Sequence, residues 1–179
     1  MGIEIVKFFN RLGRGTAVDL LTRLVSYIPL LGTFWISVAI AIFFLDSRNG
    51  LQISIAMAIA AGLHFGVTGE LMKKYMSRYF KRARPYIAYP DEVFSLGKRH
   101  TDPPFPSGHM SANLALLSVA VYAYPSVWPA AVVWVLLMAF ARMHNGMHYP
   151  GDIAAGVVLG ILYGTLAVYL VNSFYYVLS

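Results

Sequence analysis

Long uncharged stretches alternate with short polar segments along the chain. The uncharged runs extend from Leu24 to Leu45, from Asn49 to Gly69, from Met110 to Ala141 and from Ile153 to Ser179. A helix that spans a bilayer needs roughly 20 mostly apolar residues, so three of these runs predict one span each. The third run is long enough for two spans, and Tyr124-Pro125-Ser126 with Pro129 marks the turn between them. The pattern predicts an all-α integral membrane bundle of five transmembrane helices.

The first twenty or so residues have a different pattern. Basic residues alternate with apolar ones there: Lys7, Arg11, Arg14 and Arg23 with Ile3, Ile5, Val6, Phe8, Phe9 and Leu12. This pattern is typical of an interfacial amphipathic helix that lies on the bilayer, although a sixth span remains an alternative. We see no cleavable signal pattern, internal repeat or long linker, and residues 1–179 are therefore expected to form a single membrane-embedded domain.

Composition and charge placement sharpen this picture. The chain is 58% hydrophobic and only 12% charged, which is too apolar for an ordinary soluble domain, and it contains no cysteine for disulfide or thiolate chemistry. The net charge is +6, and eight of the fourteen Lys and Arg residues lie between Lys73 and Arg99. Counting spans places this basic segment on the same membrane face as the turn from Arg142 to Asp152. The positive-inside rule would put that face in the cytoplasm, unless the cations are there to bind phosphate.

The basic segment from Arg78 to Pro85 has two interpretations. It is a juxtamembrane anchor for anionic lipid headgroups, or part of a binding site. The anchor does not explain Arg84-Pro85, where the proline is expected to end a helix and fix the direction of the guanidinium. Arginine suits phosphate because its planar fork meets two oxygens at once.

A second candidate segment is Pro106-Ser107-Gly108-His109. The prolines before it prevent a helix until Pro106, so Ser107, Gly108 and His109 are expected at a helix N-terminus. Free backbone N–H groups and the helix dipole make such a terminus a binding site for anions. The alternative is an ordinary capped helix with an incidental histidine.

The third candidate segment contains Arg142, His148 and Asp152. The spacing of His148 and Asp152 allows the carboxylate to reach the imidazole and fix its tautomer, which leaves the other nitrogen basic. A structural polar contact and metal ligation are the alternatives. His64 is interpreted as a structural histidine within the second span.

These three segments together resemble the type 2 phosphatidic acid phosphatase superfamily. Its pattern is K-x6-R-P, then P-S-G-H, then S-R-x5-H-x3-D. Arg84-Pro85, the segment from Pro106 to His109, and Arg142 with His148 and Asp152 follow this order and spacing.

The chain departs from the family pattern at two positions. Ser77 stands where the first lysine is expected, and Ala141 stands where the serine before the arginine is expected. Arg78, one residue later, and Lys74, about one turn earlier, are alternatives for the missing cation.

The resemblance implies a role for each candidate residue. His148 is expected to be the nucleophile that forms a phosphohistidine, with Asp152 orienting it. His109 is expected to protonate the leaving oxygen and later to activate water. The phosphate oxygens would be held by Arg84, Arg142, Arg78 or Lys74, and the backbone N–H groups of Ser107 and Gly108. No metal or other cofactor is expected, since cations already surround the phosphate.

The expected function is therefore that of a membrane lipid phosphatase. Similar family members act on undecaprenyl pyrophosphate, phosphatidylglycerophosphate or lipid A 1-phosphate at the outer face of the bacterial inner membrane. The expected partners are a lipid phosphate and the bilayer; neither nucleic acid nor a protein partner is indicated. Additional cations favour a strongly anionic headgroup such as lipid A 1-phosphate, unless they only bind bilayer lipid: Lys73, Lys74, Lys81, Arg82, Lys98 and Arg99.

Two other classes of protein are alternatives to a lipid phosphatase. Four histidines, His100, His109, His144 and His148, lie on one face and would suit a metal- or haem-binding membrane protein. Nearby arginines would repel a cation, and haem ligands are usually placed inside spans. A transporter is disfavoured because ionisable residues cluster at one surface rather than in the middle of the bundle.

Overall fold

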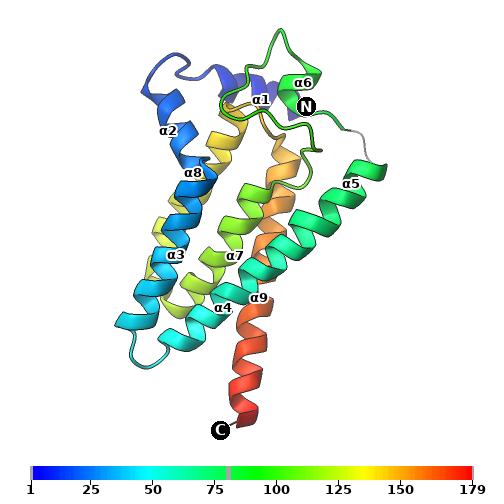
Figure 1. The fold of residues 1–179 in the computed structure, drawn as a ribbon. Coiled ribbons are helices and arrows are strands. Elements are labelled where there is room, and N and C mark those ends of the chain that lie inside the picture. The colour runs from blue at the N-terminus through cyan, green and yellow to red at the C-terminus, as the bar shows by residue number, and fades with distance from the viewer. Residues whose placement is uncertain (1, 80–81, 179) are drawn as a thin grey trace.

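Long helices run side by side in the computed structural model, which describes residues 2–79 and 82–178 (Figure 1). Those residues form helices and loops without strands. The helices are α1 (Gly2–Arg11), α2 (Ala17–Val25), α3 (Ile28–Leu45), α4 (Gly50–Leu63), the π-helix η1 (His64–Met72), α5 (Lys73–Tyr79), α6 (Pro85–Ala88), α7 (Gly108–Ala123), the 3₁₀ helix η2 (Pro125–Val127), α8 (Trp128–His144) and α9 (Pro150–Leu178). The predicted all-α membrane bundle is confirmed.

Four of the described helical segments are long and apolar enough to cross a membrane: α3, the continuous α4–η1–α5, η2 with α8, and α9. The fifth predicted span corresponds to α7, which has 16 residues and packs against α4, α8 and α9. The predicted break in the third uncharged run is present, because α7 ends at Ala123 and α8 begins at Trp128. The second span continues ten residues past its uncharged run, to Tyr79.

Small residues allow α7 and α9 to pack closely. A Cβ atom added at Gly156 would lie 2.7 Å from the carbonyl oxygen of Ser107 in α7's N-cap, and one at Gly164 would lie 2.6 Å from that of Ala115. Both distances are too short for a real side chain. Spaced glycines of this kind let membrane helices approach each other at the backbone, and here they hold the N-terminus of α7 beside the start of α9.

The π-helix η1 changes which side chains share a face. His64 and Lys73 are nine residues apart, and nine residues make about two turns of a π-helix but about two and a half turns of an α-helix. The wider turn therefore brings both residues to the same side of the helix. Thr68, between them, is fully buried and shares a 2.8 Å hydrogen bond with the Tyr163 hydroxyl of α9, which fastens this segment to the bundle.

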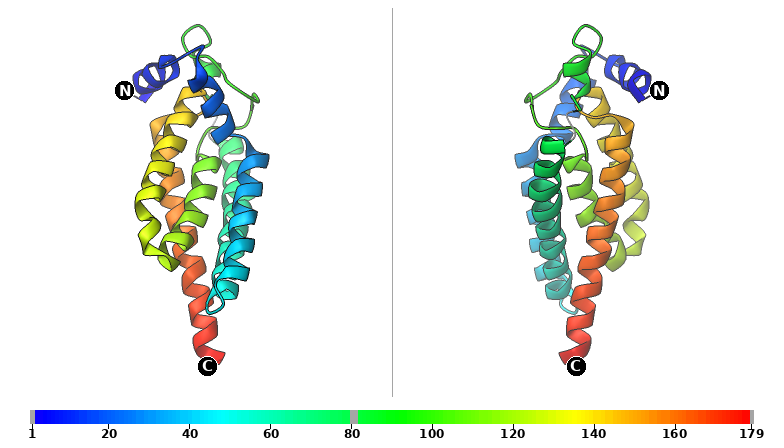
Figure 2. Two further views of the ribbon diagram at one scale, coloured as in Figure 1. Left: turned by 90° about the vertical axis from the view of Figure 1, so that its left-hand side faces the viewer. Right: turned by 90° about the vertical axis from the view of Figure 1, so that its right-hand side faces the viewer.

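The N-terminal helices cover one end of the bundle. Figure 2 shows α1 at this end. The amphipathic helix predicted over the first twenty or so residues is divided into α1 and α2 by a turn at residues 12–16. Val6 and Asn10 of α1 are buried, whereas Ile5 and Phe8 are exposed. In the described part of the chain, no segment before Ile28 is long and apolar enough to span the membrane.

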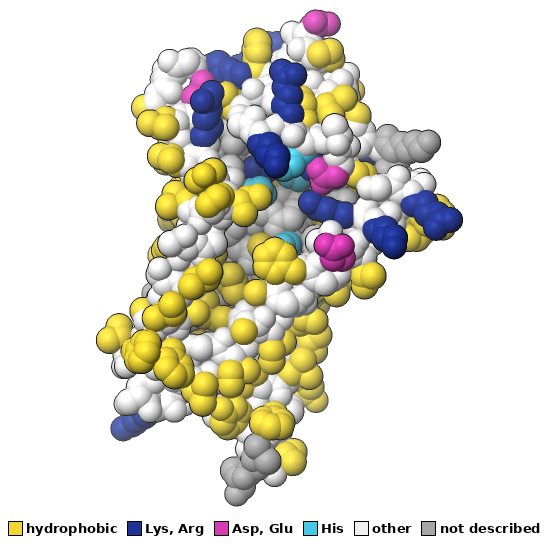
Figure 3. All heavy atoms as spheres, in the orientation of Figure 1, with side chains coloured by type: hydrophobic (Ala, Val, Ile, Leu, Met, Phe, Trp, Pro, Cys, Tyr) yellow, Lys and Arg dark blue, Asp and Glu magenta, His cyan; other side chains and the backbone are white. Residues whose placement is uncertain are grey.

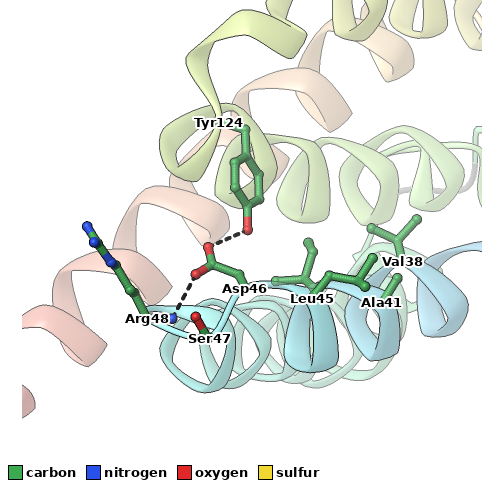
Figure 4. A pocket seen from close by; sticks show the side chains of 8 residues that line it. Val38, Ala41, Leu45, Asp46, Ser47, Arg48 and Tyr124 are labelled. Atoms are coloured by element: carbon green, nitrogen blue, oxygen red, sulfur yellow. Dashed lines mark hydrogen bonds between the residues drawn. The ribbon is translucent and has the colours of Figure 1, made fainter.

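The opposite end of the bundle is closed by a polar contact between two turns. The carboxylate of Asp46 accepts hydrogen bonds from the backbone N–H groups of Arg48 and Asn49 and from the Tyr124 hydroxyl at 2.7 Å (Figure 4). The backbone N–H of Asn49 and the Tyr124 hydroxyl hold the pKa of Asp46 below its usual range although burial opposes the shift. This end has a surface hollow, but its lining contains no histidine.

Candidate active site

A cavity of about 450 Å³ lies between α3, the α4–η1 helix and α7, near the end that the N-terminal helices cover. Its lower walls are apolar and include Ile28, Leu31, Trp35, Phe65 and Leu116. Its upper wall is basic and is formed by Lys73, Arg84, Arg142, His64, His100, His109 and His148. In Figure 3 histidine side chains lie within this hollow, Lys and Arg gather around and above it, and hydrophobic side chains cover the helices below. The cavity thus offers cations beside an apolar compartment.

His148 is placed in the turn between α8 and α9 and is buried. Its Nδ1 atom lies 2.8 Å from the carbonyl oxygen of Pro104. A carbonyl can only accept a hydrogen bond, so Nδ1 carries the proton and the lone pair of the neutral ring is on Nε2. Burial, with the positive charges of Arg142 and Arg84, lowers the pKa of His148 well below its usual range. The ring is therefore a neutral imidazole with a basic Nε2.

Asp152 does not hydrogen-bond His148 in this structure. Its Oδ2 atom lies 3.9 Å from His148 Nδ1 and accepts a 2.8 Å hydrogen bond from the backbone N–H of Tyr149. Its Oδ1 atom lies 3.3 Å from Arg82 Nη1. Asp152 is thus fixed near the imidazole as a buried negative charge, while the Pro104 carbonyl sets the tautomer. The sequence analysis instead expected the Asp152 carboxylate to fix the tautomer of His148.

Arg84 is buried and its side chain is almost fully hydrogen-bonded. Nε donates to the backbone carbonyl of Asp102 and Nη2 to its carboxylate, both at 3.0 Å. Nη1 donates to the carbonyl of Met147 at 3.1 Å and lies 3.4 Å from His148 Nε2. This places a fixed guanidinium directly beside the basic nitrogen of His148.

Arg142, in the last turn of α8, is as buried as Arg84 but differs in its bonding. Its Nε atom has no hydrogen-bond partner among the described residues, and neither has the buried hydroxyl of Ser107. Buried polar groups are nearly always paired, and Arg142 lines the cavity, so an anion there would supply an acceptor that its guanidinium lacks. Ser107 is not among the residues that line the cavity.

The N-terminus of α7 adds further donors to the same place. Ser107 is the N-cap, as predicted, and Gly108 lines the cavity. The backbone N–H of Ser107 is occupied, because it donates a 2.9 Å hydrogen bond to the carbonyl of Asp152. The anion site at this helix start therefore consists of the N–H groups from Gly108 onward rather than that of Ser107.

His109 lies one residue further along α7 and also lines the cavity. Its Nε2 atom is 2.9 Å from the carbonyl of Ser26, at the end of α2, and therefore carries a proton. Nδ1 is left as the nitrogen that can exchange a proton with a bound molecule. Asn113, one turn below, donates to the His109 carbonyl and accepts hydrogen bonds from the indole N–H groups of Trp35 and Trp134, which gives the cavity a rigid floor.

Lys73 is the cation beside the helix start at Gly108, and the sequence analysis named it only among the additional cations for the headgroup. Lys73 lines the cavity and pairs with Asp102 at 3.1 Å, whereas the two predicted alternatives, Lys74 and Arg78, are exposed and do not line it. The family pattern counts residues along the chain, whereas the π-helix η1, which ends directly before Lys73, determines which residues of α5 face the cavity. Among the described cations proposed for the headgroup, Lys73 alone lines the cavity. Lys74, Lys98 and Arg99 are exposed, and Arg82 contacts Asp152. Lys81 lies outside the described residues.

Two further sequence interpretations change. Pro85 was expected to end a helix, but it begins the short helix α6, and Arg84 is the extended residue before it. His64 was interpreted as structural, but it lines the cavity, and its Nδ1 lies 3.0 Å from the Ser111 hydroxyl. The sequence feature that could have identified His64 is its nine-residue separation from Lys73. This separation places both side chains on one side of a π-helix but not of an α-helix.

The four histidines of the metal-binding alternative do not converge. His144 is fully buried and turned away from the cavity: its Nδ1 donates to the Phe9 carbonyl, and its Nε2 lies 2.8 Å from the Asp19 carboxylate. Within residues 2–79 and 82–178 no three His, Cys, Asp or Glu side chains are arranged to hold a metal ion. The geometry instead resembles a site for a phosphate group next to a hydrophobic chain.

These features define a class: a multi-pass membrane protein with a histidine and arginine site that opens beside apolar helices. Residues 49–176 match the model of the PAP2 superfamily, and the chain belongs to that family of lipid phosphatases. It is a hydrolase of that family.

Individual relatives are distant in sequence. The chain is 29% identical over 102 residues to an undecaprenyl-diphosphatase, BcrC, of Bacillus subtilis, a match that covers 56% of this chain and 51% of the relative. It is 23% identical over 148 residues to a lipid A 4'-phosphatase of Bacteroides thetaiotaomicron, covering 78% and 65%. The chain spans less than two thirds of the length of either relative.

The fold is also similar to a solved structure. The crystal structure of Aquifex aeolicus LpxE superimposes with a TM-score of 0.73 and 20% sequence identity, covering 94% of both chains. At this identity the likeness concerns the fold alone.

Proposed function

We propose that this protein removes a phosphate group from a bacterial membrane lipid phosphate or pyrophosphate through a phosphohistidine on His148. The observation that carries the proposal is the neutral imidazole of His148, whose basic Nε2 faces Arg84 at 3.4 Å within a cavity that is apolar on its other side. A nucleophile, phosphate-binding cations and space for a lipid chain therefore meet in one place.

In the first step His148 Nε2 attacks phosphorus and the bond to the leaving oxygen breaks. Arg84, Arg142, Lys73 and the N-terminus of α7 stabilise the charge on the phosphoryl oxygens. His109 enters this step as the imidazolium: its Nε2–H stays on the Ser26 carbonyl, and the proton on Nδ1 passes to the leaving oxygen. Asp152 stabilises the positive charge that His148 acquires.

In the second step water hydrolyses the phosphohistidine. His109 Nδ1 now accepts a proton from the water molecule that attacks phosphorus, and the bond to His148 Nε2 breaks. The phosphate leaves and both histidines return to their starting protonation states. The cations of the cavity supply the charge stabilisation, so the mechanism includes no metal ion.

The substrate is an anionic lipid such as undecaprenyl pyrophosphate, lipid A 1-phosphate or phosphatidylglycerophosphate. The names of two relatives support the first two classes. The argument from additional cations supports lipid A less strongly than the sequence suggested, because among the described members of that group only Lys73 lines the cavity. We place the protein in the bacterial inner membrane with the site on the extracytoplasmic side.

The first experiment measures phosphate release by the purified wild type and His148→Ala with EDTA present, across the three lipids. Release that survives EDTA and is lost in the variant is expected, together with an acid-labile phosphoprotein that forms in the wild type alone. Release that EDTA abolishes, or that His148→Ala retains, contradicts the proposal. Lys73→Ala should reduce turnover strongly, with Lys74→Ala and Arg78→Ala as matched controls of similar charge.

The orientation is tested separately by cysteine labelling in intact cells, since the natural chain has no cysteine. Lys98→Cys lies at the site end, and Arg48→Cys lies at the opposite end; both positions are exposed. An impermeant reagent should label position 98 and spare position 48. The reverse pattern would place the site in the cytoplasm.

A further inference from the structure

Asp102 is an acidic residue bound to the cations of the site. Its Oδ2 atom lies 3.0 Å from Arg84 Nη2 and 3.1 Å from Lys73 Nζ, and its Oδ1 atom lies 3.7 Å from His100 Nδ1. Burial would raise the pKa of Asp102, but Arg84 and Lys73 together keep it below its usual value. Asp102 is thus ionised at neutral pH and occupies donors that a bound phosphate would use.

The residues that line the cavity include Lys73, Arg84 and Arg142 but no carboxylate. Without Asp102 this wall would carry three full positive charges beside apolar helices. Such a site would attract any anion, and the phosphodiester headgroups of the bilayer surround it at high concentration. The reaction also releases inorganic phosphate directly onto the same donors.

We propose that Asp102 is an affinity-setting residue that competes with external anions for Lys73 and Arg84. By lowering the affinity of the site for every anion, it keeps the site free of bilayer phosphodiesters and allows the product phosphate to leave. This inference rests on the proposed phosphatase function and adds a residue that limits binding rather than one that promotes it.

The geometry distinguishes this role from simple support of Arg84. The guanidinium is also held by the backbone carbonyls of Asp102 and Met147, and neither bond depends on the Asp102 side chain. Lys73 is 36% exposed at its side chain, and both Lys73 and Arg84 line the cavity, so an anion in the cavity can reach these donors. Replacing it with an isosteric amide removes the charge and keeps an oxygen acceptor for Nη2.

The test compares the wild type with Asp102→Asn in mixed micelles, with a lipid phosphate that the wild type hydrolyses. The inhibition constant of inorganic phosphate should fall roughly two- to fivefold in the variant, because one competing charge is lost at a partly exposed site. Added phosphatidylglycerol should inhibit the variant at mole fractions that the wild type tolerates. Phosphatidylcholine, which has no net charge, should affect both proteins equally.

Two matched variants serve as controls. Asp91→Asn removes the same charge from an exposed position in the same connecting segment and should leave the inhibition constant unchanged. Asp102→Glu keeps the charge and should restore weak phosphate binding. Asp102→Ser tests the same loss of charge if the asparagine variant does not fold, as judged by thermal unfolding.

An inhibition constant for phosphate that is unchanged or higher in Asp102→Asn overturns this inference, and a higher one with a lower kcat shows that Asp102 only positions Arg84. Absence of turnover by the wild type on all lipid phosphates would instead refute the proposed function. The two failures are therefore distinguishable.

Discussion

Replacing the two buried arginines of the site with methionine is expected to change stability in opposite directions. Methionine has similar length and suits a buried position. Arg84 and Arg142 are 3% and 4% exposed, so burial does not distinguish them. Their bonding does, because Arg84 donates to Asp102 and to the Met147 carbonyl, whereas Arg142 has an unpaired Nε.

The expected magnitudes follow from this difference. Arg84→Met leaves two carbonyl groups without their donor and removes one of the two cations that pair with Asp102, which keeps Lys73, so the variant should be destabilised by roughly 1–3 kcal/mol. Arg142→Met removes a buried positive charge whose guanidinium lacks a full set of hydrogen-bond partners. It also removes the repulsion between this charge and the two other cations of the wall. The free energy of unfolding of the ligand-free protein should therefore rise by about 1–3 kcal/mol. Turnover should fall at least about 10²-fold in both variants, because each donor stabilises the transition state.

Thermal unfolding in detergent, with and without inorganic phosphate, measures these effects. Phosphate at 100 times its dissociation constant should stabilise the wild type by about 2.7 kcal/mol and Arg142→Met much less. Arg78→Met, at an exposed position, is the control and should change neither stability nor turnover appreciably. Equal destabilisation by Arg84→Met and Arg142→Met would refute the argument, since it would mean that Arg142 is satisfied within the protein.

Three other predictions concern the surroundings of the site. Asp152→Asn should lower kcat by about 10²–10³-fold, because the Pro104 carbonyl still fixes the tautomer of His148; formation of the wrong tautomer would cost roughly 10⁴-fold. Single-turnover kinetics measure this loss, and a loss tenfold larger than expected would count against the prediction. Asp19→Asn should destabilise the protein by about 1–3 kcal/mol at pH 7, since it breaks a charged hydrogen bond to His144. Burial opposes the shift, but His144 lowers the pKa of Asp19, so this stabilisation is fully present above the unfolded pKa of about 3.9 and is lost as the pH falls through the lower folded pKa. A deficit that does not shrink between pH 5 and pH 3 would disprove the pairing. Tyr124→Phe should lower the unfolding temperature slightly and leave turnover unchanged, because its contact with Asp46 lies at the far end of the bundle.

Features that depend on local sequence were predictable. The uncharged runs gave the helices of the bundle, and the prolines before Ser107 gave the helix start that places Gly108 and His109 at the cavity. Arg84, Arg142 and His148 also reach the same cavity. Hydrophobic length and proline stereochemistry act within a few residues, so both can be read from the chain directly.

Features that depend on register or on backbone groups far away were not predictable. Lys73, rather than Lys74 or Arg78, lines the cavity, and the π-helix η1 before it determines which residues of the following helix face that cavity, which a count of residues cannot show. The partner of His148 Nδ1 is the carbonyl of Pro104, 44 residues earlier. Every residue has a carbonyl, so no side-chain pattern could identify this one.

The N-terminal segment lies before the residues that match the family model, yet it is bonded to both halves of the site. The Ser26 carbonyl fixes Nε2 of His109, and Ser26 is in turn held by the side chain of Asn145, whose neighbour His144 binds Asp19. Asn145 and His144 belong to the same turn as His148, and this turn is sharp because Gly146 adopts a φ of 70° beside the carbonyl of Phe94. A single turn therefore orients the nucleophile that we assign and fastens the segment that sets the proton position on His109. The two histidines are coupled through backbone and amide contacts, which explains why an N-terminal helix outside the family pattern is packed against the site.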